Sequence, residues 1–93
     1  MKLQELFTDE SKWTKEAFAR NKNNLKVDVS SPFAVCWCIY GGVMKCYGQD
    51  GEDKSFILSR ILALNNFVSV IDFNDCELTT FEDIKKIIKE LDI

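Results

Sequence analysis

Between Phe33 and Tyr47 the chain carries a single charge, that of Lys45. A segment with so little charge has to be covered on nearly every side by the rest of the chain. Its longest apolar run, residues 33–44, is interrupted only by two glycines and falls well short of the ~20 residues that span a bilayer. We therefore expect the segment at the centre of the fold, and no membrane association.

Two structures fit this segment. The run Ser30-Ser31-Pro32 is a helix-start signal, because serine accepts bonds from free backbone N–H groups and proline has no N–H to leave unsatisfied. It predicts a helix over residues 32–47 that ends at Gly48. The same residues also fit a two-stranded hairpin on the Gly41-Gly42 turn, rich in β-branched and aromatic side chains. Spacing alone does not separate the two.

Local patterns predict a hairpin and further helices around this centre. Alternating Leu25, Val27 and Val29 follow an asparagine-rich tetrad that tolerates left-handed backbone, which indicates a hairpin near residues 17–29. Apolar spacing predicts helices over 2–7 and 55–65, the latter with Leu64 on its buried side.

The last third of the chain is predicted by similar signals. Thr79 and Glu82 have capping-box spacing at the start of a final helix. Residues 48–53 are expected to be a loop, and 67–73 fit a strand or a helical turn. The predicted fold class is α+β: one mainly helical domain over residues 1–93, with a small β-hairpin near residues 17–29 and a central buried helix near 32–47.

Composition excludes several chemistries. The chain has no histidine, which rules out a Ser-His-Asp relay, a His-ligated metal and a histidine pH switch. Fifteen acidic residues against twelve basic ones leave a net charge of −3, which argues against direct nucleic-acid binding. The N-terminal residues lack the apolar stretch of a signal peptide, so we expect a cytoplasmic protein with reduced cysteines.

The four cysteines are candidate metal ligands or nucleophiles. In a strand Cys36 and Cys38 would share a face, and with Cys46 and Cys76 they would make a zinc site conceivable, but the familiar two-residue spacings are missing. Cys36 would lie early enough in a helix to feel its dipole, but among apolar neighbours. Burial as small apolar side chains is the stronger interpretation, so we predict no metal site, no cofactor and no catalytic residue.

Two acidic clusters are the candidate binding residues. The first is Asp50, Glu52 and Asp53, whose spacing departs from that of a calcium-binding loop. The second comprises Asp72, Asn74, Asp75 and Glu77, in which carboxylates lie on both sides of the Asn74 amide in the sequence. Clustered carboxylates can hold a cation, but Asn and Asp before a helix more often bond to nearby backbone groups and shape the turn.

Several short motifs recur together in one known family. Trp13-Thr14 is followed by Ala19-Arg20, then by Ala34-Val35, Trp37-Cys38 and Gly41, and finally by Asn74-Asp75 shortly before Thr79. In these motifs the chain resembles a family of small bacterial and phage proteins classed as a domain of unknown function. The chain has Glu16 where that family commonly has glycine, and Gly41-Gly42 where it has Gly-Ala. The resemblance implies a helical Trp-Cys segment and no activity.

These observations favour a small acidic protein-interaction module without catalytic activity. The interpretation extends to a phage or mobile-element protein that binds and inhibits a host defence protein, with the acidic clusters facing a basic partner surface. The alternative is a small-molecule-binding domain or minor enzyme, with a pocket between the Trp37 helix and the Asn74-Asp75 turn. A homo-oligomer that covers exposed aromatic residues is a further alternative.

Overall fold

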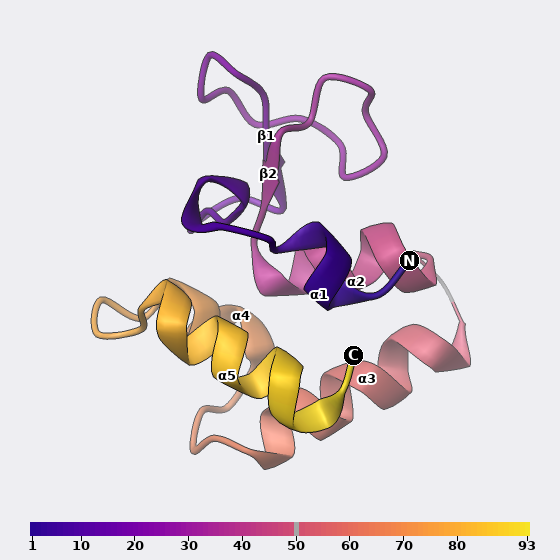
Figure 1. The fold of residues 1–93 in the computed structure, drawn as a ribbon, viewed down its shortest axis with the longest axis vertical. Helices are drawn as coiled ribbons and strands as arrows, with labels where there is room; N and C mark the ends of the chain where they lie inside the picture. Colours follow the sequence, from indigo (N-terminus) through magenta and orange to yellow (C-terminus); the bar gives the residue numbers. More distant parts are fainter. Residues whose placement is uncertain (50) are drawn as a thin grey trace.

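The computed structural model describes residues 1–49 and 51–93, and it consists of short helices and one small antiparallel sheet at one end of the molecule (Figure 1). In chain order the elements are α1 (Leu3–Leu6), the 3-10 turn η1 (Glu10–Lys12), β1 (Ala19–Arg20), β2 (Cys36–Trp37), α2 (Ile39–Tyr47), α3 (Glu52–Ala63), α4 (Val70–Asp75) and α5 (Phe81–Leu91). The predicted α+β, mainly helical class is confirmed. No helix in the described residues is long and apolar enough to cross a membrane.

Helix α2 lies in the middle of the molecule. In Figure 1 the sheet and its two long loops stand on one side of α2, and α3, α4 and α5 lie on the other. Ile39 and Val43 of α2 are fully buried, as are Leu3, Ile61 and Ile84 from three other helices. The apolar segment is therefore central, and the helices pack their apolar faces against it.

The predicted helix over 32–47 is wrong in its first half. Strand β2 and the cap residue Cys38 come first, and the helix begins only at Ile39. The Trp-Cys segment is therefore extended, contrary to the helix that the family resemblance implied. The helix interpretation is right for residues 39–47, whereas the hairpin interpretation is wrong, because β2 covers only residues 36–37 and pairs with β1. The Gly41-Gly42 pair lies inside α2 and forms no turn.

The serine-proline signal does start a turn, but the turn is not continued. Ser31 accepts bonds from the backbone N–H groups of Phe33 and Ala34, both at 3.1 Å. The next backbone N–H, that of Val35, donates instead to the Arg20 carbonyl at 2.9 Å. Pairing with β1 thus takes the donor that a helix would have needed next.

The expected hairpin near residues 17–29 is present only as a turn, and the strand before this turn, β1, pairs mainly with β2. Asn21 donates to the Leu25 carbonyl at 2.9 Å, and Arg20 forms an isolated antiparallel bridge with Lys26. The sheet itself pairs β1 with β2, with Ala19 opposite Trp37. Apolar alternation located the turn, but it contains no information about a pairing with a segment sixteen positions further along.

Three boundaries in the second half also differ from the prediction. Glu52 and Asp53 lie in the first turn of α3 and not in a loop, and Leu64 is 42% exposed just beyond its end. The ambiguous segment 67–73 enters α4, which is capped by Ser69. The capping box at α5 is shifted by one residue.

That shift has a physical cause. Thr80 is the N-cap of α5. Its Oγ1 accepts from the backbone N–H of Asp83 at 3.3 Å, and its own backbone N–H donates to Asp83 Oδ2 at 2.9 Å. Thr79 is buried, and its hydroxyl donates to the Phe73 carbonyl at 2.7 Å. A bond to the end of α4 therefore removes Thr79 from the capping position.

Candidate functional site

The predicted acidic residues do not form one site. Glu52 and Asp53 are exposed at the N-terminus of α3, where carboxylates interact favourably with the helix dipole. Asp72 and Glu77 are exposed on α4 and just after it. Asp50 lies outside the described residues. The structure brings together only the adjacent pair Asn74 and Asp75, and it joins them to residues far away in the sequence.

The Asn74 side chain is fully buried and connects three segments. Its Oδ1 accepts from Trp13 Nε1 at 2.7 Å and from the backbone N–H of Ile39 at 2.9 Å. Its Nδ2 donates to the Thr14 carbonyl at 3.1 Å and to Asp75 Oδ1 at 2.9 Å. The amide thus uses both of its donors and both of its acceptor positions. A buried group satisfied in this way supports a structural role for Asn74.

Asp75 holds an unusual piece of backbone in place. Its Oδ1 also accepts from the backbone N–H of Glu16 at 2.9 Å. Glu16 has φ 63°, in the left-handed region that favours glycine. No hydrogen bond from the described residues reaches Oδ2 of Asp75. One carboxylate oxygen is therefore engaged in the fold, and the other is free for a ligand.

The motifs that carry the family resemblance meet in this region. Trp13 and Asn74 bond directly, and Arg20 Nε donates to Thr14 Oγ1 at 3.1 Å. The Cys38 Sγ, at the start of α2, accepts from the backbone N–H of Gly41 at 3.2 Å. Residues spread over most of the chain thus form one hydrogen-bonded region between β1, α2 and α4.

A cavity of about 370 Å³ opens beside Asp75. Most of its wall is apolar and comes from residues 17–19, from Val27 and from Ile71 of α4. Four residues with polar or ionisable side chains also line it: Glu16, Lys26, Cys38 and Asp75. The volume lies within the range of roughly 300–1,000 Å³ typical of small-molecule pockets. The cavity lies among the segment that leads into β1, residues 26–27, the start of α2 and helix α4. The pocket that the sequence analysis placed between a Trp37 helix and the Asn74-Asp75 turn stays a prediction.

The Trp37 ring is not part of that wall. Trp37 is buried, is not among the residues that line the cavity, and donates from Nε1 to the Val29 carbonyl at 3.1 Å. The aromatic wall is Phe18 instead. Its ring lies 5.5 Å from that of Tyr40, measured between centroids.

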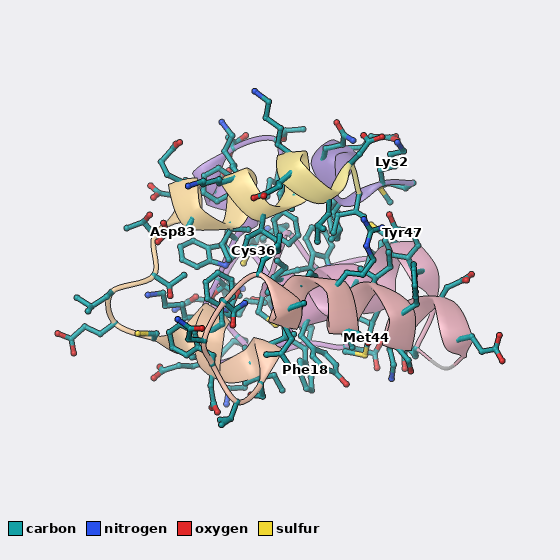
Figure 2. The ribbon with its side chains drawn as sticks, turned by 90° about the horizontal axis from the view of Figure 1, so that it is seen from below. Lys2, Phe18, Cys36, Met44, Tyr47 and Asp83 are labelled. Carbon is teal, nitrogen blue, oxygen red and sulfur yellow. The ribbon has the colours of Figure 1, made fainter. Side chains whose placement is uncertain are left out.

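An exposed apolar surface borders the cavity. Phe18 is 47% exposed and Ile71 37% exposed, and Tyr40 packs on Phe18. We call these three residues the Phe18 patch. Figure 2 shows Phe18 at the edge of the molecule beside α4, away from Lys2 and from Asp83 of α5. The patch and the cavity form one continuous surface, because Phe18 and Ile71 belong to both.

Burial lowers the reactivity of two of the four cysteines. Burial raises the pKa of the Cys38 thiol to about 11, and burial likewise raises that of Cys46 to about 11. Thiols with such pKa values are protonated near neutral pH and are poor nucleophiles. In residues 1–49 and 51–93, no three Cys, Asp or Glu side chains are grouped so as to hold a metal ion.

Sequence analysis missed Glu16 and Phe18. For Glu16 a signal existed, because it stands where the resembling family has glycine, and its left-handed backbone accounts for that preference. For Phe18 there was none, since the exposure of an apolar side chain in a short segment depends on which elements pack around it.

Comparisons of this chain with family models, with curated proteins and with solved structures find no match. The family resemblance therefore stays a prediction. The function has to be inferred from the geometry of the cavity and of the Phe18 patch.

Proposed function

We propose that the chain is a protein-interaction module without catalytic activity, which binds a basic surface of a partner protein through the Phe18 patch. The observation that carries this proposal is the half-exposed Phe18 ring, stacked on Tyr40 and bordered by Ile71 and the cavity. Aromatic residues are enriched in protein interfaces, and a few of them next to pockets supply most of the binding energy.

The charges around the patch favour a basic partner. Asp72 and Asp75 belong to the same short helix as Ile71. Lys54 Nζ lies 5.8 Å from the centroid of the Tyr40 ring, which places the first turn of α3, with Glu52 and Asp53, beside the patch. Complementary charge of this kind accelerates association and selects partners.

The test is affinity capture from a lysate of the protein's own host, with quantitative mass spectrometry. We expect a stoichiometric partner for the unchanged protein and its loss for Phe18→Ser and for Asp72→Lys. Two matched controls should retain it: Phe33→Ser, which removes a phenylalanine 72% exposed on another loop, and Glu90→Lys on α5. Equal recovery of the partner by Phe18→Ser and Phe33→Ser would overturn the proposal.

A second function is favoured by the cavity itself. Its size and mainly apolar wall also suit a small organic ligand held by Asp75. A thermal-shift screen would detect such a ligand, and Ile71→Arg, which fills the mouth of the cavity, should abolish the shift. A ligand that stabilises both proteins equally would bind elsewhere and would argue against this second function.

A further inference from the structure

The cavity combines features that single out one kind of chemical group. Its lining is mainly apolar and includes Phe18, and two of the lining residues carry carboxylates, Glu16 and Asp75. Asp75 is half-buried and keeps Oδ2 free of hydrogen bonds from the described residues. A carboxylate beside an aromatic ring and apolar walls attracts a cation that carries an apolar stem.

Lys26 also lines the cavity, and its positive charge repels a cation that enters there. It is exposed, and no ion pair within 4.0 Å joins it to Glu16 or Asp75 among the described residues. Two carboxylates against one ammonium group leave the lining with an excess negative charge. Lys26 therefore weakens the binding of a cation without cancelling it.

Among cationic side chains, arginine fits this lining better than lysine. The guanidinium group is planar and weakly hydrated, it stacks on aromatic rings, and its forked N–H donors suit carboxylates. The lysine ammonium is strongly hydrated and loses more on entering an apolar cavity. Of the lining residues, Phe18 has a half-exposed ring that could supply the stacking surface, and Asp75 has an Oδ2 that accepts no hydrogen bond from the described residues.

We propose that this cavity receives the guanidinium group of an arginine side chain of the partner protein, with Asp75 as the acceptor and Phe18 as the stacking surface. The inference rests on the proposed function, because it names the partner group that enters next to the Phe18 patch. It requires an arginine at the centre of the partner's basic surface.

The test uses a capped arginine as the probe. The ¹⁵N-labelled protein is titrated with Nα-acetyl-arginine N-methylamide and followed by two-dimensional NMR. We expect the amide signals of Ala17, Ala19 and Val27 to move most. The capped citrulline analogue has nearly the same shape but no charge, and it should bind about tenfold or more weakly, as expected for loss of a charge-assisted bond. Equal binding of the two probes would overturn the proposal.

Three variants give the electrostatic signature. Asp75→Asn keeps an oxygen that can accept from Glu16 and Asn74, and it should weaken the binding of the capped arginine about tenfold. Lys26→Gln should strengthen binding severalfold, a gain that a purely structural role for Lys26 does not predict. Glu90→Gln, an exposed carboxylate on α5 outside the lining, is the matched control and should leave binding unchanged. Equal effects of Asp75→Asn and Glu90→Gln would contradict the inference.

The two proposals fail in different ways. If a partner is captured through the Phe18 patch but the capped arginine does not bind in the cavity, the inference falls and the proposed function stands. If free agmatine binds far more tightly than the capped residue, the cavity belongs to a free small cation and the partner arginine is excluded. If the capped arginine binds but Phe18→Ser captures the partner as well as the unchanged protein does, the patch is not the interface.

Discussion

Asn74 shows how one side chain can organise a fold of this size. It links the loop before β1, the start of α2 and the end of α4 through four hydrogen bonds, and all of them are made without water. If the amide were lost, the fully buried backbone N–H of Ile39 would be left unsatisfied, and Trp13 Nε1 and the Thr14 carbonyl would lose a partner in a partly buried region. The same residue looked at first like a ligand-binding candidate, because clustered polar side chains have the same sequence pattern in both roles.

Replacing Asn74 by alanine should therefore destabilise the protein severely. We expect Asn74→Ala to lower the free energy of unfolding by ~3–5 kcal/mol, since several buried partners lose their bonds. Urea denaturation followed by tryptophan fluorescence measures the change, with Trp13 as a local reporter. Glu77→Gln, at an exposed position three residues away, should stay within about 0.5 kcal/mol. A loss no larger than that of Glu77→Gln would show that Asn74 is not essential to the fold.

Replacing Glu16 by glycine should stabilise the protein. A side chain in left-handed backbone costs ~1–2 kcal/mol, and part of the gain is offset by the greater freedom of glycine in the unfolded chain. We expect Glu16→Gly to raise the free energy of unfolding by about 0.5–1 kcal/mol in the same urea experiment. Glu77→Gly, where φ is not positive, should lower it. If both changes have the same sign, the backbone of Glu16 is not the cause.

Helix α2 illustrates how tertiary contacts decide what an element tolerates. Two consecutive glycines weaken a helix by ~1 kcal/mol each relative to alanine. A Cβ at Gly41 would lie only 2.0 Å from the Phe18 carbonyl oxygen, a backbone atom. A Cβ at Gly42 would meet the far end of the Phe7 ring at 2.5 Å. The close approach of α2 to the Phe18 segment therefore requires glycine at the first position, while the second depends on a side chain that can shift.

Alanine at these two positions should have unequal effects. We expect Gly41→Ala to lower the midpoint of thermal unfolding strongly, with a loss of ~3 kcal/mol or more, because backbone has to move. Gly42→Ala should cost at most about 1–2 kcal/mol, since gained helix propensity offsets repacking of Phe7. The same thermal melts, recorded by circular dichroism at 222 nm, serve as the measurement. A greater loss for Gly42→Ala would contradict this account of the two contacts.

The other elements differ from the prediction only at their ends. The helix α5 was expected from Phe81, Ile84, Ile87, Ile88 and Leu91 on one face, and it forms with that face buried or half-buried. Its first cap was misassigned by one residue because Thr79 bonds to the Phe73 carbonyl. Local pattern thus determines where a helix forms, and competing bonds from neighbouring elements determine its first residue.

The whole molecule should lose stability in alkaline solution. Burial raises the pKa of the Cys38 thiol from its ordinary value of 9.0 to about 11 and raises that of Cys46 to about 11, and burial also raises the pKa of Tyr47. The folded state therefore holds these protons more firmly than the unfolded chain. The contribution is complete below pH 9 and is lost as the pH rises towards 11, by roughly 2–3 kcal/mol for Cys38. Cys46 contributes less, because solvent screens a half-buried group.

Urea denaturation between pH 8 and pH 11 would measure this decline. Cys38→Ser keeps an acceptor for the Gly41 backbone N–H and removes the titrating thiol, so its stability should fall less steeply with pH. The remaining slope belongs to Cys46 and Tyr47. If Cys38→Ser shows the same pH dependence as the unchanged protein, burial of this thiol is not what links stability to pH.

The candidate site, like the fold, could be predicted from the sequence only in part. Sequence analysis singled out the Asn74-Asp75 pair, because polar residues between apolar segments mark the ends of elements. It did not single out Phe18, and the pocket that it expected beside Trp37 stays a prediction.

The sequence by itself determined the α+β class, the central place of the apolar segment and the positions of most helices, because apolar periodicity and turn residues act over a few neighbouring positions. Only the tertiary structure decided that residues 36–37 are a strand and that α2 begins at Ile39. It also decided that Glu52 and Asp53 begin α3, while Asn74 and Asp75 bond to segments far away in the sequence. These outcomes depend on hydrogen bonds between segments far apart in the chain, such as that from Val35 to Arg20, and no local pattern encodes such bonds.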